Sequence, residues 1–521
     1  MRSGLSLLGI GVIAACQGSD APSKICDPPR GEPMNRFADI TTAAGIDFGY
    51  STPDFKGAGL AVADLDGDGL PEIVGSRRIG GLAYFRNRGN RRFEKVLDSG
   101  LDPTWAGSAI ATADLDNDGD LDLVISGQNV AHLMANNGDG TFVEAQRFDD
   151  IGITEQILPV DLDNDGKLDL YFSNYDLRSA YGTMNRVFHN QGNLQFAYAG
   201  TAGGARSWSA TAIDIDDDGD KDLYVANDTL VVDFGGPTET STLPPDMLLR
   251  NDGFGTDGQF HYTDLATTMG LTAPRSSMGG LLADFNDDGR LDVLVPNFGA
   301  NKLFLRDATG GFVESAAQLG LAAIERDNDV CGPGTQERDC LLVSWTAKLS
   351  DFDLDGYDEL VVVNGETELG KPPPVLMYVN TPDEPWHEVA PSIDCLDARA
   401  MVVTDIDGDG DQDLVIAQKS SPLVVYENRG TPSATSWLRV TLRGTTSNRD
   451  GAGALVIAHL ASGRTVQKPI AVGGMIHIGS PAEAFIGLGE DSVQSLEVHW
   501  PSGRITTVPG PLTGAVTLDE G

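Results

Sequence analysis

Asp64-Leu65-Asp66-Gly67-Asp68-Gly69-Leu70-Pro71-Glu72 is a nine-residue loop with carboxylates at positions 1, 3, 5 and 9 and glycine at position 6. Equivalent loops begin at Asp114, Asp161, Asp214, Asp284, Asp351 and Asp405. A hard cation such as Ca²⁺ takes about six to eight oxygen ligands, and this spacing gathers carboxylates around one point. The glycine permits the sharp turn. Seven copies of one pattern predict a repeat architecture.

Each loop is a predicted calcium site, in which the ion clamps the structure around it. The fifth loop has Asn286 at position 3, which offers a carbonyl oxygen but lowers the charge, so this site is expected to bind more weakly. With position 7 included, the seven predicted ligand sets are Asp64, Asp66, Asp68, Leu70 and Glu72; Asp114, Asp116, Asp118, Asp120 and Asp122; Asp161, Asp163, Asp165, Lys167 and Asp169; Asp214, Asp216, Asp218, Asp220 and Asp222; Asp284, Asn286, Asp288, Arg290 and Asp292; Asp351, Asp353, Asp355, Tyr357 and Glu359; and Asp405, Asp407, Asp409, Asp411 and Asp413.

The competing interpretation is the EF-hand, which needs a bidentate Glu at position 12 of its loop. Position 12 is occupied here by residues that cannot bind a cation, namely Gly75, Ile125, Phe172, Val225, Val295, Val362 and Ile416. The last ligand stands instead at position 9, and an apolar run such as Leu123-Val124-Ile125 follows at once. Short β-branched and aromatic runs after a turn predict strands.

The repeats also predict how these strands are grouped. A small apolar segment precedes each loop, as at 400–404, so each loop joins two strands of a hairpin. A third strand, a turn and an aromatic residue follow, as in the stretch from Tyr84 to Phe93. Four antiparallel strands per repeat form the blade of a β-propeller, so we expect an all-β fold with seven blades.

The last repeat lacks one strand of its blade. Its third strand lies at 423–430, but no aromatic fourth strand follows. Arg36-Phe37-Ala38-Asp39-Ile40 resembles the fourth strands around Phe93 and Phe312. This N-terminal segment is therefore predicted to supply the missing outer strand, and closing the ring removes exposed sheet edges.

A smaller β-sandwich-like module is expected after the propeller, because alternating apolar and polar residues at 438–442, 454–458 and 496–500 predict strands. The predicted organisation is a signal peptide at 1–15, a tether at 16–35, the propeller at 36–432 and the module at 433–521.

The motifs resemble known families. The repeat is similar to the FG-GAP or VCBS repeat of integrin α-subunit propellers over roughly residues 36–430. The C-terminal part resembles the ASPIC/UnbV module through the stretch 447–453, Gly487-Leu488-Gly489 and Trp500-Pro501-Ser502-Gly503. This pairing is similar to the cartilage acidic protein family and its bacterial relatives. By fold-level analogy, the integrin resemblance implies a calcium-binding propeller with a role in adhesion.

The N-terminus is typical of an export signal. Arg2 precedes the apolar stretch 5–13, and Ala14-Ala15-Cys16 follows. The ending resembles a bacterial lipobox, which implies that Cys16 is lipidated. The alternative is an ordinary cleaved signal with an incidental cysteine. No other stretch approaches the ~18 apolar residues of a transmembrane helix. We therefore expect an exported lipoprotein at the bacterial outer membrane or cell surface, held by a lipid anchor.

Four further cysteines suit an oxidising compartment: Cys26, Cys331, Cys340 and Cys395. Three pairings are possible. Cys331 with Cys340 closes a short loop, and Cys26 with Cys395 joins the segment before the closing strand to the start of the last blade. This second bond fits the closed ring, and the alternative is four unpaired thiols.

Charge and composition exclude several functions. The formal net charge is −41, with 77 acidic and 36 basic residues, and no basic stripe with interleaved aromatics indicates nucleic-acid binding. The seven histidines are scattered, and cation coordination already accounts for the paired carboxylates, so no catalytic residue is assigned. His477 and His499 are interpreted as surface or core residues.

The expected partner-binding face lies at the ends of the blades opposite the loops, where second strands lead into third strands. Long insertions follow this rule, at 175–185, 228–246, 365–374 and, between blades, 325–341. Recognition tends to reside in such loops. Candidate contacts are Arg77, Arg78, Asn174, Asn227, Asp228, Asn297, Asn364, Glu366, Trp208 and Trp345, with Met278 beside the tryptophans at the channel mouth. Alternatively, the asparagines cap strand ends and the tryptophans pack between blades.

The function predicted from the sequence is recognition of an extracellular protein or polysaccharide. One alternative is a propeller enzyme acting on extracellular carbohydrate or polymer, which a deep channel pocket with convergent titratable groups would favour. The other is a surface assembly scaffold built on the C-terminal module.

Overall fold

The computed structural model describes residues 31, 33–34, 36–50, 57, 59–175, 184–204, 206–228, 245–272, 276–322, 342–365, 372–381, 384–430 and 437–521. These residues form strands almost throughout, with one short helix, α1 (Ala266–Met269). No described helix has the length and apolar character that crossing a membrane requires. The predicted all-β class, a propeller followed by a small β module, is confirmed.

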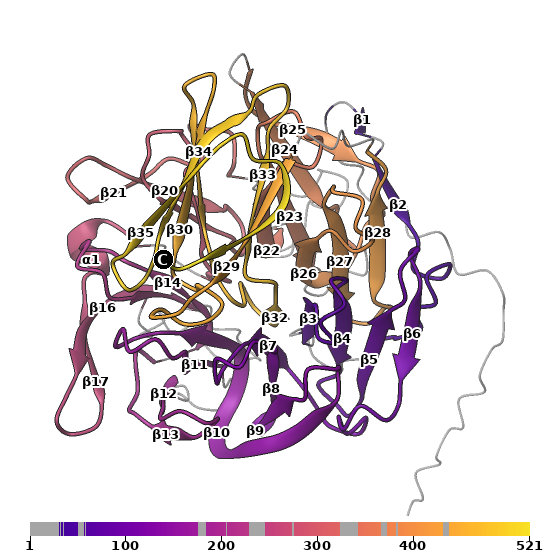
Figure 1. The fold of residues 1–521 in the computed structure, drawn as a ribbon, viewed down its shortest axis with the longest axis vertical. Helices are drawn as coiled ribbons and strands as arrows, with labels where there is room; N and C mark the ends of the chain where they lie inside the picture. The colour runs from indigo at the N-terminus through magenta and orange to yellow at the C-terminus, as the bar shows by residue number, and fades with distance from the viewer. Residues whose placement is uncertain are drawn as a thin grey trace, which may run out of the picture.

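The described propeller strands form six sheets around a common axis (Figure 1), and we divide them in chain order into blades 1 to 7 on the basis of the seven carboxylate loops. The long strand β10 serves two of them, since Phe142–Asp149 pairs with β9 and Thr154–Val160 pairs with β11. Blade 1 consists of β3 (Leu60–Ala63), β4 (Glu72–Ser76), β5 (Leu82–Asn87) and β6 (Phe93–Val96), blade 2 of β7 (Ala109–Ala113), β8 (Asp122–Ser126), β9 (Gln128–Asn136) and β10 (Phe142–Val160), and blade 3 of β10, β11 (Asp169–Asn174), β12 (Arg186–Asn190) and β13 (Phe196–Tyr198). Blade 4 consists of β14 (Ser207–Ile213), β15 (Asp222–Asn227), β16 (Met247–Phe254) and β17 (Phe260–Asp264), and blade 5 of β18 (Leu281–Ala283), β19 (Asp292–Val295), β20 (Lys302–Arg306) and β21 (Phe312–Glu314). Blade 6 consists of β22 (Val343–Ser350), β23 (Glu359–Gly365), β24 (Leu376–Thr381) and β25 (Glu384–Pro391), and blade 7 of β26 (Ala398–Thr404), β27 (Asp413–Gln418), β28 (Val424–Asn428) and β2 (Phe37–Asp39).

Every carboxylate loop joins the first two strands of its blade, as predicted. Position 9 is the first residue of the second strand and pairs with the last residue of the first strand, as Glu72 does with Ala63 and Asp122 with Ala113. The apolar run after position 9 is buried on both faces, because blades pack on either side of it; Ile73 and Val74 have no exposed surface. All seven loops therefore lie at one end of the ring, which we call the loop face.

The N-terminal strand closes the ring, as predicted. β2 pairs antiparallel with β28, which places Phe37 opposite Asn428. The Phe37 ring is 5% exposed and packs edge-to-face on Phe352, with 5.6 Å between ring centroids. The preceding strand β1 (Pro33–Met34) pairs parallel with β25 and adds a fifth strand to blade 6.

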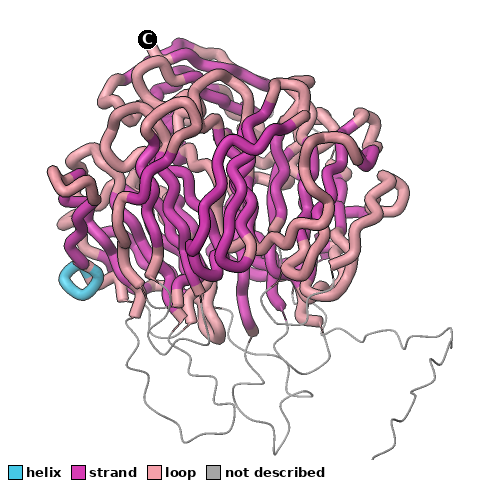
Figure 2. The backbone as a smooth tube through the Cα atoms, turned by 90° about the horizontal axis from the view of Figure 1, so that it is seen from below, coloured by secondary structure: helices cyan, strands magenta, loops and turns pink. Residues whose placement is uncertain are grey.

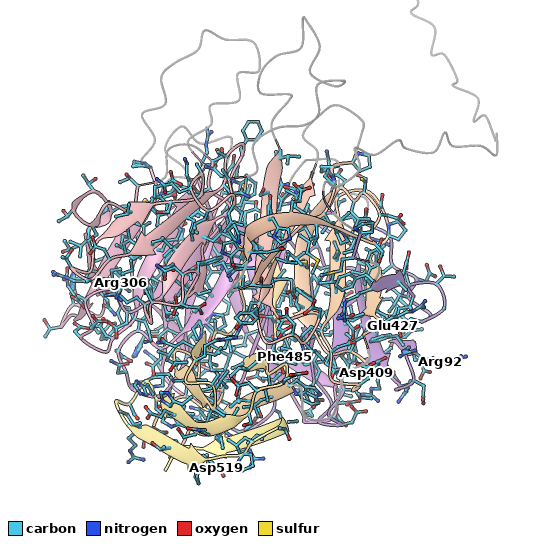
Figure 3. All side chains as sticks on the ribbon, turned by 90° about the horizontal axis from the view of Figure 1, so that it is seen from above. Arg92, Arg306, Asp409, Glu427, Phe485 and Asp519 are labelled. Atoms are coloured by element: carbon cyan, nitrogen blue, oxygen red, sulfur yellow. The ribbon has the colours of Figure 1, made fainter. Side chains whose placement is uncertain are left out.

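The C-terminal module consists of two sheets around its own core. One contains β29 (Trp437–Arg443), β33 (Glu483–Gly487) and β36 (Gly514–Asp519), and the other contains β30 (Leu455–Leu460), β31 (Thr465–Pro469), β34 (Val493–His499) and β35 (Ile505–Pro509). These include the predicted strands around 438–442, 454–458 and 496–500. In side view the module lies over one end of the propeller strands (Figures 2 and 3).

A segment of the module, residues 470–480, enters the centre of the ring and is called the axial segment. Its strand β32 (Ile478–Gly479) pairs parallel with β3, and the His477 N–H donates to the carbonyl oxygen of Glu155 at 3.0 Å. Ile476 is completely buried and clusters with Trp208 and Trp345. The axial segment thus reaches first strands from several blades and fills part of the propeller channel.

Replacing Phe37 with alanine is expected to destabilise the protein by about 3 to 5 kcal/mol, because it removes a buried ring that holds the last blade closed. Urea unfolding would measure the change. Leu97→Ala is the control, since Leu97 is 78% exposed, and its effect should stay within about 0.5 kcal/mol. Equal effects of the two substitutions would contradict closure through Phe37.

Candidate metal centres

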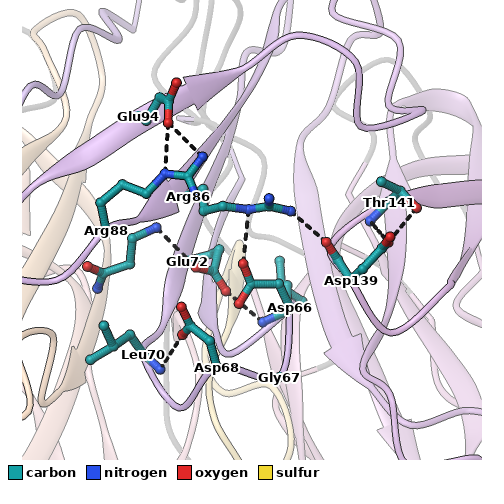
Figure 4. A network of polar contacts seen from close by, with 12 residues as sticks. Asp66, Gly67, Asp68, Leu70, Glu72, Arg86, Arg88, Glu94, Asp139 and Thr141 are labelled. Carbon is teal, nitrogen blue, oxygen red and sulfur yellow. Dashed lines mark hydrogen bonds and ion pairs between the residues drawn. The ribbon is translucent and has the colours of Figure 1, made fainter.

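The first loop is folded by its own carboxylates (Figure 4). Asp64 accepts hydrogen bonds from the N–H groups of Gly67 and Gly69, both at 2.9 Å. Asp68 accepts one from the N–H of Leu70, also at 2.9 Å. Gly69 has φ of +91°, a conformation that residues with a Cβ rarely adopt, which explains the glycine at position 6. The loops beginning at Asp114, Asp284, Asp351 and Asp405 repeat the bond from position 6 to position 1.

The carboxylate at position 9 is held by backbone N–H groups from two directions. Glu72 accepts from the N–H of Leu65 at 2.8 Å and from the N–H of Asn87, in the third strand, at 3.0 Å. The same two donors recur in blades 2, 3, 4, 5 and 7, at Asp122, Asp169, Asp222, Asp292 and Asp413. The carboxylate at position 9 therefore fixes the loop to the blade, whether or not it also binds a cation.

The loops fit a hard divalent cation. Oxygens from Asp351, Asp353, Asp355 and Glu359 lie within 4.8 Å of one another, and so do ligand atoms in the loops beginning at Asp64, Asp114 and Asp214. Across the seven loops, several carboxylate oxygens are buried without a hydrogen-bond partner among the described residues. They belong to Asp66, Asp116, Asp161, Asp163, Asp214, Asp220 and Asp411. Buried oxygens without donors are costly, and a bound Ca²⁺ would satisfy them through the predicted ligand sets.

The electrostatics of the loops also favour a cation. Burial is the main cause that raises the pKa of Asp122 to about 8 and that of Asp114 to about 7. Glu72 and Asp161 are likewise raised, each to a pKa of about 7, again mainly by burial. Deprotonating such groups together is unfavourable in the metal-free protein. A divalent cation bound beside them would favour their ionised form.

The loops differ in the basic groups that approach them. Arg86 lies 2.9 Å from Asp66 and gives the first loop a protein counter-charge at position 3. His189 Nε2 lies 3.0 Å from Asp163 and could hold a metal ion together with Asp163 and Asp165. In the fifth loop the Asn286 amide donates to Asp288 at 2.9 Å, and Arg290 pairs with the same carboxylate. These contacts compete with a cation and agree with the weaker binding expected there. At position 7, oxygens of Asp220 and Asp411 are unpartnered, and the ligand role of position 7 stays a prediction.

A pattern of hydrogen bonds that recurs from blade to blade was not anticipated. The Asn136 side-chain amide donates to the carbonyl oxygen of Leu65, in the loop of the preceding blade, at 2.9 Å. Its own oxygen accepts from the N–H of Gly138 at 3.0 Å. Equivalent bonds to the preceding loop come from Asn87, Asn190, Asn251 and Asn428, and from Arg306 in blade 5. The repeated Asn-x-Gly triplet after the third strand was the available sequence signal.

The C-terminal module contacts the loop face. Asp450 accepts from the N–H of Asp114 at 2.8 Å, and the N–H of Arg449 donates to Asn117 at 2.7 Å. Gln467 donates to the carbonyl oxygen of Gly289 at 3.1 Å, and Lys468 pairs with Asp358. The module thus reaches the loops of blades 2, 5 and 6.

The candidate contacts of the opposite face are mostly buried. Among those in the described residues, Arg78, Asn174, Asn227, Asp228, Asn297, Asn364, Trp208, Trp345 and Met278 have at most 4% exposed surface. Asn174 donates to the carbonyl oxygens of Ile151 and Met184, both at 2.8 Å. Trp208 and Trp345 pack edge-to-face around Ile476. Arg77 is half-buried over the Phe48 ring. These are structural roles, and direct contact with a partner stays a prediction.

Several predicted residues lie outside the described ranges, namely Cys16, Cys26, Cys331, Cys340 and Glu366. Cys395 is disulfide-bonded, and since it is the only cysteine in the described ranges, its partner lies outside them. The pairing with Cys26 stays a prediction. His477 is a core residue, one of the two expected alternatives, since it has no exposed surface. Its ring Nδ1 donates to the carbonyl oxygen of Ser108 at 2.6 Å in the channel.

Comparison with known proteins places two kinds of domain on this chain. The FG-GAP-like repeat family matches residues 64–125, 114–172 and 161–225. The ASPIC and UnbV family matches residues 444–519. The resemblance seen in the sequence is confirmed, and an FG-GAP propeller is a ligand-binding kind of domain.

Relatives extend over half of the chain. Cartilage acidic protein 1 of Homo sapiens is 29% identical over 277 residues, which are 50% of this chain and 38% of the human protein. The Xenopus tropicalis protein of that name is 30% identical over 50% of this chain and 39% of its own length. The match thus spans less than two-fifths of these relatives. A lectin structure from Burkholderia pseudomallei aligns with TM-score 0.45 and 11% identity over 72% of this chain and 97% of the lectin.

Asn136→Ala is expected to cost about 1 to 3 kcal/mol of stability, because it leaves buried carbonyl oxygens of two blades without a donor. Asn137→Ala is the matched control, since the neighbouring Asn137 bonds only to Thr141 at the surface, and should stay within about 0.5 kcal/mol. Urea unfolding in the presence of calcium would compare them. A cost for Asn136→Ala no larger than the control would argue against the inter-blade bond.

Calcium removal is expected to lower the melting temperature, and increasingly so at higher pH. The buried carboxyls have folded-state pKa values above those of the unfolded chain, so the metal-free folded protein holds protons that the unfolded chain has released. The contribution of these carboxyls to the stability of the metal-free protein is therefore full below about pH 4 and is lost as the pH rises through 7 to 8.

Calorimetry with calcium and with chelator, from about pH 5 to pH 8, would measure this difference. Bound calcium keeps the carboxylates ionised, so the gap between the two melting temperatures should widen with pH. Identical melts at pH 8 would show that the loops do not take up the cation.

Proposed function

We propose that this chain is an exported, calcium-stabilised propeller that recognises an extracellular protein or polysaccharide, as in adhesion, on the face opposite its carboxylate loops. We call this the distal face; it is the end of the blades where second strands lead into third strands. The proposal extends the ligand-binding character of FG-GAP propellers to a particular surface of this chain.

The observation that carries the proposal is the position of the C-terminal module. It contacts the loops of blades 2, 5 and 6 and sends the axial segment into the channel from the same side. Loops on a rigid scaffold are common recognition elements, and the described part of the distal face, such as the connection between β4 and β5, supplies none of these contacts.

Two exposed apolar side chains mark the distal face. Ile79, between β4 and β5, is 61% exposed, and Met184, just before β12, is 47% exposed. Each follows the second strand of its blade, so both lie at the end opposite the loops. Exposed apolar residues on connections of a rigid scaffold are suited to contact with a partner.

Calcium would be held by the seven predicted ligand sets, where it would offset carboxylate charge and stabilise the blades. The basic and apolar N-terminal stretch before Cys16 supports export with a lipid tether, at the outer membrane or cell surface. A bond between Cys26 and Cys395 would then join the tether to blade 7, and one between Cys331 and Cys340 would close the loop that joins blades 5 and 6.

The test is a glycan and surface-protein binding screen with wild-type protein in calcium, followed by Ile79→Asp with Met184→Asp on every hit. We expect the double variant to reduce binding at least tenfold, because charge is placed in the proposed interface. Leu97→Asp with Val143→Asp is the matched control, since these side chains are 78% and 59% exposed and lie just after the outer strand β6 and on the outer strand β10. Unchanged binding by the first pair, or equal loss with the second, would exclude the distal face.

A further inference from the structure

A cavity of about 120 Å³ lies where the C-terminal module covers blades 5, 6 and 7. The propeller side contributes β18, Lys348 of β22 and Gln412 of the last loop. The module contributes β31, with Arg464 just before it, and residues that follow the axial segment, including Ser480 and Glu483. Neither domain alone encloses this space. It lies on the loop side of the molecule and is separate from the distal face.

Two residues on the cavity walls have buried hydrogen-bond donors without acceptors. Gln412 is 2% exposed, and its Nε2 has no partner among the described residues. Arg464 Nε is also buried without an acceptor, although another nitrogen of its guanidinium donates to the carbonyl oxygen of Gly356. These are the only buried unpartnered side-chain atoms on the described walls, and both are donors. An unsatisfied donor in a cavity calls for an acceptor from a ligand.

Lys348 adds a positive charge to the same walls. Within the described part of the chain its ammonium group has no carboxylate within 4.0 Å, in contrast to Lys468, which pairs with Asp358. Its side chain is accessible, yet the protein around it desolvates it enough to lower its pKa. A side chain that faces an internal cavity has this combination of accessibility and dense surroundings.

The acidic residues on the walls have partners of their own or face water. Asp358 is paired with Lys468, and Glu483 accepts from Thr404 at 3.4 Å with Arg439 4.0 Å away. Asp284 directs its oxygens to N–H groups of its own loop, at 2.8 and 3.1 Å. Asp287 is exposed to solvent. On the described walls, Lys348, Gln412 and Arg464 therefore carry nitrogen donors with no hydrogen-bonded carboxylate, although Glu483 and Asp358 attract the Lys348 ammonium group from a longer distance. Together these donors suit an anion.

We propose that this cavity is a binding site for a small hydroxylated carboxylate of the sugar-acid class, whose carboxylate accepts from Lys348 and Gln412. A water molecule occupies on the order of 10 to 15 Å³ in this measure, so the cavity holds a ligand of roughly ten non-hydrogen atoms. Thr465, Ser480 and Asn380 on the walls offer hydrogen bonds to hydroxyl groups. Since both domains contribute walls, the ligand would bridge the module and the propeller.

The test is calorimetric titration of the full chain, in calcium, with glucuronate and with glucose as the uncharged counterpart. We expect glucuronate to bind at least tenfold more tightly than glucose. Lys348→Met should weaken glucuronate at least tenfold, and Lys348→Arg should retain most of the affinity because it keeps the charge. Lys95→Met is the control, since Lys95 is exposed on blade 1, and it should leave binding unchanged.

A melting curve of each variant would show that it is folded, and the conservative Lys348→Arg change keeps the test decisive if Lys348→Met unfolds. Equal binding of glucose and glucuronate, or glucuronate affinity unaffected by Lys348→Met, would overturn the proposal. Loss of glucuronate binding in Ile79→Asp with Met184→Asp would place the sugar acid on the distal face instead, and would equally overturn it.

Discussion

The structure depends on one repeated contact, the buried carboxylate at position 9 that accepts N–H groups from its own loop and from the third strand. At Asp122 these donors are Leu115 and Asn136, and the Asn136 side chain continues to the loop of the preceding blade. A hairpin, a blade and its neighbour are therefore tied at one point. Since a buried charge is costly unless it is fully bonded, this point tolerates little displacement.

The carboxylates of the loops serve two purposes that the sequence pattern does not separate. Position 9 is satisfied by backbone donors, whereas oxygens at positions 1, 3 and 7 are left without partners in several loops. The hydrogen bonds to position 9 support the blade without metal. The unpartnered oxygens at positions 1, 3 and 7 are the groups that would bind a cation. Cation binding would thus adjust the stability of a fold whose connectivity is already set by hydrogen bonds.

The local features of the fold could be predicted from the sequence because they depend on residues close together in the chain. The loop spacing predicts each hairpin, and the aromatic similarity of Phe37 to Phe93 predicts the closing strand. The axial segment could not be predicted, because the burial of Ile476 and His477 depends on strands from blades far apart in the sequence. Asn174 was ambiguous for a similar reason: an asparagine at a strand end has the same local signature whether it caps a turn or contacts a partner.

The axial segment also imposes an order on the maturation of the protein. Residues 470–480 follow all seven blades in the chain, so the ring is synthesised before the element that fills it. Until the segment docks, the walls around Trp208 and Trp345 surround an unoccupied axis, and the donors that meet His477 and Met475 have no protein partner. A chain that ends before residue 470 would therefore leave a ring whose centre is open to water.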